Sequence, residues 1–143
     1  KPFPHPAGEV VVTPHPGEMA RLTGLSAAAL ATDREGIALR YAKAWNAVVV
    51  LKGARTVVAS PDGRVCVNPT GNPGLARGGS GDVLTGVIAS LMAQRADALR
   101  AAAVGVWLHG RAGDLAEQEL TAYSVTPEDV VRKLPDAIRE ILE

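Results

Sequence analysis

The chain has 143 residues, 47% of them hydrophobic, and its 15 basic residues balance 15 acidic ones. A chain of this length can bury a core, so we interpret residues 1–143 as a single domain. The zero net charge argues against nucleic-acid binding, and the longest apolar run, residues 101–108, is too short to span a membrane.

The first residues, Lys1-Pro-Phe-Pro-His-Pro6, have no apolar centre, so we do not interpret them as a signal peptide. We expect His5, in this proline-rich stretch, to be exposed to solvent. Four segments then have the composition of strands, at residues 10–12, 47–51, 56–60 and 64–67. The first predicts a short buried strand. The second is a continuous apolar run, which is typical of a strand covered on both faces.

The last two strand segments flank Pro61-Asp62-Gly63, whose turn chemistry predicts a hairpin. The second of them contains Cys66, the only cysteine, which excludes an internal disulfide and favours a reducing, cytoplasmic location. We expect a buried thiol rather than a nucleophile, since no acid–base partner lies nearby in sequence. No Cys/His spacing indicates zinc.

Helices are predicted at residues 16–22, 33–44, 80–94 and 98–119, and a last one begins at residues 126–129. Asp33 can act as an N-cap, and Thr126-Pro-Glu-Asp129 combines a cap hydroxyl, a proline and two acids. Strands precede the long helices, which predicts a layered α/β domain. Three long C-terminal helices beside so small a sheet indicate the C-terminal part of a larger α/β unit.

The most informative segment is Asn72 to Gly86, which places glycines at 74, 78, 79 and 81 before a predicted helix. A helix that begins on glycines presents bare N–H groups, here those of Gly79, Ser80 and Gly81, and the positive end of its dipole. Such a helix start attracts phosphate or another anion. Asp82 would repel that anion unless it removes a proton from an attacking hydroxyl, so we predict a general base. The alternative is a turn in which Asp82 only caps the helix.

Lys52 follows a predicted buried strand and precedes Gly53, at the sheet edge where α/β proteins bind ligands. Its amine can contact phosphates, and Thr56 can offer a hydroxyl group. The alternative is a solvated lysine at the end of a strand, which is at least as consistent with this segment alone.

Pro14-His15-Pro16-Gly17-Glu18 also follows a predicted strand, and its prolines fix the direction of His15. His15 can contact substrate or can be a surface histidine beside a capped helix. Glu18 fits a residue that stabilises the helix dipole better than it fits a metal ligand. His109, inside a predicted Ala-rich helix, is expected to be packed and hydrogen-bonded.

Four motifs then occur in order and at suitable spacing: Thr13–Met19, Val50–Ala54, Gly71–Gly86 and Leu108–Asp114. Together they resemble the C-terminal half of the ADP-dependent NAD(P)H-hydrate dehydratase family, within the ribokinase-like superfamily. The resemblance runs from about Val10 to Glu143 and implies a ribokinase-like layered sheet with flanking helices. The family domain has a further N-terminal half, so part of the sheet and further substrate contacts are expected from outside this chain.

The resemblance implies a hydro-lyase that repairs NADH and NADPH. The hydroxyl of the S epimer of the hydrate receives a phosphoryl group from ADP (or ATP), and loss of phosphate restores the dihydronicotinamide. By similarity, the adenine nucleotide contacts Lys52, Gly53, Ala54, Arg55, Thr56 and Gly81. The hydrate contacts His15 and Asp82 by the same similarity. Mg²⁺ is expected with the nucleotide, although no local motif names its ligands.

Two residues depart from the family pattern. Leu75 replaces a usual methionine, and Arg77 stands where a threonine is common. Two other functions also stay open. One is a ribokinase-like kinase of a small molecule such as a vitamin precursor, which the loop at residues 14–18 disfavours. The other is a non-catalytic, nucleotide-binding half of a split protein. The Ala-rich helices also predict a homo-oligomer.

Overall fold

The computed structural model describes residues 8–143, so His5 lies outside the described residues. Its sheet has the order β1-β2-β3-β4, and the strands are β1 (Val11–Val12), β2 (Val48–Leu51), β3 (Val57–Ala59) and β4 (Val65–Val67). β1 runs parallel to β2, whereas β2–β3 and β3–β4 are antiparallel. All four predicted strands are therefore present, and the predicted hairpin is β3–β4.

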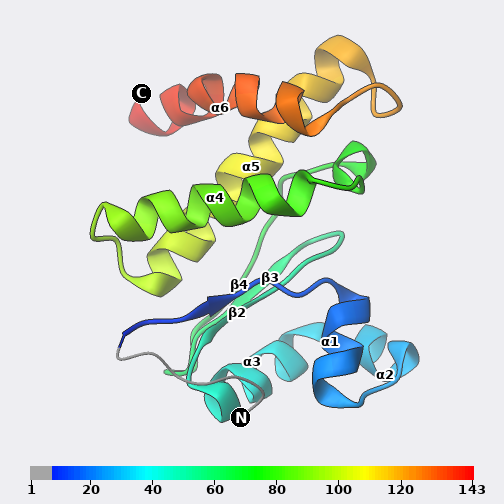
Figure 1. Cartoon of the computed structure of the whole chain (residues 1–143), viewed down its shortest axis with the longest axis vertical. Helices are drawn as coiled ribbons and strands as arrows, with labels where there is room; N and C mark the ends of the chain where they lie inside the picture. The colour runs from blue at the N-terminus through cyan, green and yellow to red at the C-terminus, as the bar shows by residue number, and fades with distance from the viewer. Residues whose placement is uncertain (1–7) are drawn as a thin grey trace.

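Helices cover both faces of this sheet in separate layers (Figure 1). One face carries α1 (Pro16–Thr23), α2 (Ala27–Thr32) and α3 (Arg34–Trp45). The other carries α4 (Ser80–Ala93) and α5 (Ala98–Leu120), with α6 (Pro127–Leu142) packed beyond them. The predicted layered α/β arrangement is confirmed. Within residues 8–143, no helix combines the length and apolar composition that a membrane crossing needs.

The ends of the helices follow local sequence chemistry. The side chains of Asp33 and Thr126 accept hydrogen bonds from the backbone N–H groups of Gly36 and Asp129, as predicted for N-caps. α1 ends at Gly24, whose φ of 74° places it in the left-handed region that glycine adopts without strain. The short helix α2 was not predicted. It is capped by Ser26 and has only six residues.

β2 is completely buried because each of its two faces packs against a different layer. Val49 and Leu51 belong to the core with α1–α3, and Val48 and Val50 belong to the core with α4 and α5. The prediction of a strand covered on both faces is confirmed. The carboxyl end of this strand is thus held between two helical layers, which fixes the residues that follow it.

Two burial predictions were wrong. The strand at residues 10–12 is half-buried, because β1 is an edge strand paired only with β2 among the described residues. Cys66 is exposed. Cys66 lies on β4, the other edge strand among the described residues, opposite Val58 of β3, whereas α5 packs over β2 and β3. Partial burial still raises the pKa of its thiol, which disfavours the nucleophilic thiolate.

We predict opposite effects for two glycine substitutions in the paired helices. A Cβ at Gly105 of α5 would lie 2.7 Å from the Cγ1 atom of Ile88, whereas a Cβ at Gly86 of α4 would meet nothing within 4 Å. Gly86→Ala should raise the free energy of unfolding by about 1 kcal/mol through helix propensity. Gly105→Ala should lower it by about 1 kcal/mol, because overpacking outweighs that gain. Urea denaturation measures both changes, and equal stabilisation by the two variants would contradict the packing argument.

Candidate functional site

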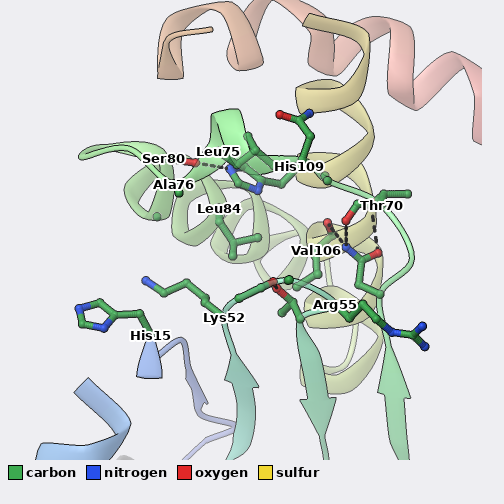
Figure 2. A pocket seen from close by; sticks show the side chains of 18 of the residues that line it. His15, Lys52, Arg55, Thr70, Leu75, Ala76, Ser80, Leu84, Val106 and His109 are labelled. Atoms are coloured by element: carbon green, nitrogen blue, oxygen red, sulfur yellow. Dashed lines mark hydrogen bonds between the residues drawn. The ribbon is translucent and has the colours of Figure 1, made fainter. Parts of the chain in front are cut away.

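A cavity of about 680 Å³ lies where β2 ends and α4 begins (Figure 2). It collects the segments that the sequence singled out separately: His15, the whole run Lys52–Thr56, Ser80 and Gly81. The sequence analysis gave no binding or catalytic role to a second group of residues around the same cavity, although several of them belong to the motifs Gly71–Gly86 and Leu108–Asp114. That group is Asn68–Pro73, Leu75, Ala76, Leu84, Val106, His109 and Gly110. The fold therefore builds one site from the edge of the sheet and the starts of two helices.

The amine of Lys52 faces the first turn of α4. A Cβ built on Gly81 would lie 2.9 Å from Lys52 Nζ, so the amine occupies the space that glycine leaves open. The Lys52 side chain is 24% exposed and lines the cavity, so the solvated lysine of the alternative interpretation is not observed. A cation and a helix N-terminus thus lie side by side, and both favour an anion.

The turn at residues 78–81, here called the glycine turn, leaves two of its three predicted N–H donors available. Ser80 N–H donates to the carbonyl of Arg77 at 3.2 Å. Within residues 8–143, the N–H groups of Gly79 and Gly81 have no hydrogen-bond acceptor. Gly79 adopts a φ of 91°, a left-handed conformation that a residue with a Cβ rarely adopts. The available anion donors are therefore the two glycine amides, with the Lys52 ammonium beside them.

Asp82 lies in the first turn of α4, next to Gly81, and its side chain is exposed. It does not line the cavity but lies immediately beside it. The start of α4 has no side-chain cap, so Asp82 is not the capping residue of the alternative interpretation. Thr85, one turn further along, lies 3.4 Å from the Thr13 hydroxyl, which brings the loop after β1 to the same side of α4.

His15 lines the cavity and is also the N-cap of α1. Its Nδ1 atom accepts hydrogen bonds from the N–H groups of Gly17 and Glu18 at 3.0 and 3.2 Å. Glu18 completes the capping box, because its Oε2 atom accepts from His15 N–H at 2.6 Å. The same carboxylate lies 3.9 Å from Lys52 Nζ. Glu18 therefore supports the helix start, as predicted, and also lies between two residues of the site.

Arg34 fixes the loop after β2 through hydrogen bonds to its backbone. Its Nη2 atom donates to the carbonyls of Leu51 and Lys52 at 3.0 and 3.2 Å, and burial lowers the pKa of this guanidinium. Gly53 has a φ of 147°, where a Cβ would also approach Arg34. The Thr56 hydroxyl donates to the Gly53 carbonyl at 3.0 Å. This hydroxyl therefore closes the turn instead of pointing unpaired into the cavity.

The segment before the glycine turn lies directly on α5. A Cβ at Gly110 would lie 2.2 Å from the Thr70 hydroxyl oxygen and 2.9 Å from its backbone carbon. That hydroxyl donates to the Trp107 carbonyl at 3.1 Å. Asp114 accepts from Gly71 N–H and from the Asn72 side chain, both at 3.0 Å. These contacts fix the wall of the cavity that the sequence did not predict.

The two departures from the family pattern have different surroundings. Leu75, in the short 3-10 helix Pro73–Leu75, packs on α5 where a Cβ at Gly113 would lie 2.7 Å from its side chain. Arg77 lines the cavity, and its guanidinium donates to the carbonyl of Tyr123 in the loop before α6. No group of three or more His, Cys, Asp or Glu residues within 8–143 could hold a metal ion.

Comparison with known proteins identifies close relatives. A sequence model of the NAD(P)H-hydrate dehydratase family matches residues 1–136. A bifunctional NAD(P)H-hydrate repair enzyme of Moorella thermoacetica is 53% identical over 136 residues, which cover 95% of this chain and 26% of that protein. The chain thus spans about a quarter of the length of this relative.

Solved structures agree with the sequence comparison. An ADP/ATP-dependent NAD(P)H-hydrate dehydratase from Bacillus subtilis, co-crystallised with ATP and Mg²⁺, has a TM-score of 0.92 and 38% identity. The match covers 98% of this chain and 50% of that one. A ribokinase-like superfamily protein from Enterococcus faecalis has a TM-score of 0.76 and 33% identity, over 92% of this chain and 44% of its own. The fold is therefore ribokinase-like, as expected.

We predict that Asp114→Ala destabilises the protein by about 1–3 kcal/mol, because Gly71 N–H and the Asn72 amide lose their acceptor. Glu117→Ala, one turn further along α5, is the matched control, since its carboxylate has no hydrogen-bond or ion-pair partner within residues 8–143. Thermal unfolding of both variants measures the difference. A similar melting temperature for the two variants would show that Asp114 does not hold the loop.

Proposed function

The chain belongs to the NAD(P)H-hydrate dehydratase family, and from that premise we propose that its protein repairs hydrated NADH and NADPH. The proposed substrate is the S epimer of the hydrate, and the phosphoryl donor is ADP, with ATP as the alternative donor. The products are NAD(P)H, AMP and phosphate. The reaction removes water from the substrate, so the enzyme is a hydro-lyase. The Bacillus subtilis relative, described as ADP/ATP-dependent, supports this assignment.

The observation that carries the proposal is the meeting of Lys52 and Gly81 at the cavity. Two unpaired amides, a helix N-terminus and an ammonium group surround one point. Such an arrangement stabilises the charge on a phosphoryl group during its transfer. Because the donors are fixed by backbone, they need little reorganisation when that charge develops.

We assign the proton transfer that this reaction needs to Asp82, which lies beside Gly81 in the first turn of α4. A substrate hydroxyl beside Gly81 would lose its proton to the Asp82 carboxylate as its oxygen forms a bond to phosphorus. The bond between that phosphorus and the AMP oxygen breaks at the same time, so AMP leaves. The lone pair of the ring nitrogen then expels phosphate to leave an iminium ion, and loss of a proton from the neighbouring ring carbon restores the ring double bond. Phosphate is a far better leaving group than water, which is why the nucleotide drives the dehydration.

The other site residues would bind and orient the two ligands. The loop Lys52–Thr56 and Gly81 would contact the adenine nucleotide. The apolar side chains of Leu75, Leu84 and Val106 line the same cavity and suit a flat aromatic base. His15, which lies at the cavity wall beside α1, would contact the hydrate.

Mg²⁺ would enter this site with the nucleotide. The described residues do not form a metal-binding cluster, so the phosphate oxygens would supply most of its ligands. When bound, the ion would neutralise phosphate charge during transfer. We also propose a cytoplasmic homo-oligomer. The exposed side chains of Val131, Ile138 and Leu142 on α6 support the homo-oligomer, since association would cover them.

The protein should restore the absorbance of NADH when hydrated NADH is mixed with ADP and Mg²⁺. Asp82→Asn should lower kcat about 10²- to 10⁴-fold, because a carboxamide cannot accept the proton. The affinity for ADP should change little, since Asp82 does not line the cavity. Absorbance at the dihydronicotinamide band and calorimetric titration with ADP measure the two effects. Phosphorylation of an alcohol without NADH recovery would instead favour a superfamily kinase.

Gly81→Ala should weaken ADP binding by about tenfold or more, because the new methyl displaces the Lys52 amine from the helix start. The fold should survive, since the displaced atom is the end of a flexible side chain. Gly86→Ala adds the same methyl to the same helix in open space and serves as the control. Equal ADP affinities for the two variants would contradict the proposed phosphate site.

A further inference from the structure

A buried histidine and a buried serine meet at the back of the cavity. His109 is 8% exposed and Ser80 is 4% exposed, and both line the cavity. The Nε2 atom of His109 lies 3.1 Å from the Ser80 hydroxyl oxygen, as Figure 2 shows. The sequence predicted a packed, hydrogen-bonded His109, and this expectation is confirmed. The proposed reaction uses neither side chain.

Ser80 is the first residue of α4 and lies between the two glycines that carry the unpaired amides. Neither glycine has a side chain to hold its orientation, and the start of the helix lacks a side-chain cap. Backbone bonds hold the turn locally, from Ser80 N–H to the Arg77 carbonyl and from the Asp82 and Val83 N–H groups to the Gly79 carbonyl. The Ser80 hydroxyl adds a side-chain bond that ties the turn to another helix. Any change in the position of Ser80 therefore moves the amides of Gly79 and Gly81.

His109 is a rigid anchor for that hydroxyl. It lies in the middle of α5, beside Gly110, where the helix touches the Thr70 backbone. Burial, aided by the positive charge of Lys52, lowers the pKa of His109, so its imidazole is neutral near neutral pH. A neutral ring adds no charge to the anion site. Its contribution is the direction of one hydrogen bond from a fixed helix.

We propose that His109 is a positioning residue, which acts through the Ser80 hydroxyl to hold the Gly79 and Gly81 amides toward a bound phosphoryl group. The hydrogen bond links the start of α4 to the middle of α5 and joins two residues that lie 29 positions apart in sequence. The assignment of that phosphoryl group to ADP rests on the proposed function. The ordering of the glycine turn by His109 does not depend on the proposed function.

The test compares His109→Leu, Ser80→Ala, the double variant and His109→Gln in the intact protein. His109→Leu and Ser80→Ala should each lower kcat/KM about 10- to 100-fold, the size expected for misplaced transition-state donors. The kcat/KM of the double variant should equal that of the less active single variant, because both changes remove the same hydrogen bond. His109→Gln should recover most of the loss, since its amide can reach Ser80. Ser90→Ala, an exposed serine of α4, is the hydroxyl control.

Hydrogen exchange of the hydrogen-bonded backbone amides of Ser80, Asp82 and Val83 supplies a readout that needs neither ligand nor activity. Exchange should accelerate in His109→Leu and Ser80→Ala and return toward the wild-type rate in His109→Gln. Unchanged exchange in both single variants, or losses in kcat/KM that multiply in the double variant, would overturn the proposal. If the wild-type protein lacks dehydratase activity, the proposed function fails, while the exchange rates still decide the role of His109.

Discussion

The close approach of α5 to the rest of the chain determines the geometry of the site. Three glycines of this helix leave space for a neighbour: Ile88 packs at Gly105, Thr70 at Gly110 and Leu75 at Gly113. A Cβ at any of these positions would lie within 3 Å of its neighbour. The helix therefore holds both α4 and the segment before it at a short distance. This spacing brings the glycine turn to the carboxyl end of β2.

Local chemistry was sufficient to predict most of the fold. The caps Asp33 and Thr126, the turn at residues 61–63 and the continuous apolar run of β2 each have one dominant physical explanation. Helix α2 was missed because six residues make fewer than two helical turns, which is too short a segment to show a helical repeat of apolar residues. The exposure of Cys66 depends on where the covering helices stop, and the sequence of β4 holds no information about that limit.

The site residues also divide into those that local sequence predicted and those that depend on distant contacts. Lys52 and the glycine turn are recognisable because a strand end and a helix start each indicate anion binding locally. The position of residues 68–73 in the cavity wall was not predicted, because their partners on α5 lie 37 to 43 residues away in sequence. Two hydrogen bonds could not be predicted from the sequence, because both depend on backbone angles. They are the bond from the Thr56 hydroxyl to the Gly53 carbonyl and the bond from Ser80 N–H to the Arg77 carbonyl.

The way His15 caps α1 also restricts what it can offer to a ligand. Because Nδ1 accepts two backbone hydrogen bonds, that nitrogen carries no proton, and in the neutral ring the proton is on Nε2. The ring therefore presents a donor, and no acceptor, on its outer edge. The Glu18 carboxylate, 3.5 Å from Nε2, competes for this donor. A molecule that replaces this carboxylate must bring an oxygen or nitrogen lone pair, so the cap selects the polarity of the group that it meets.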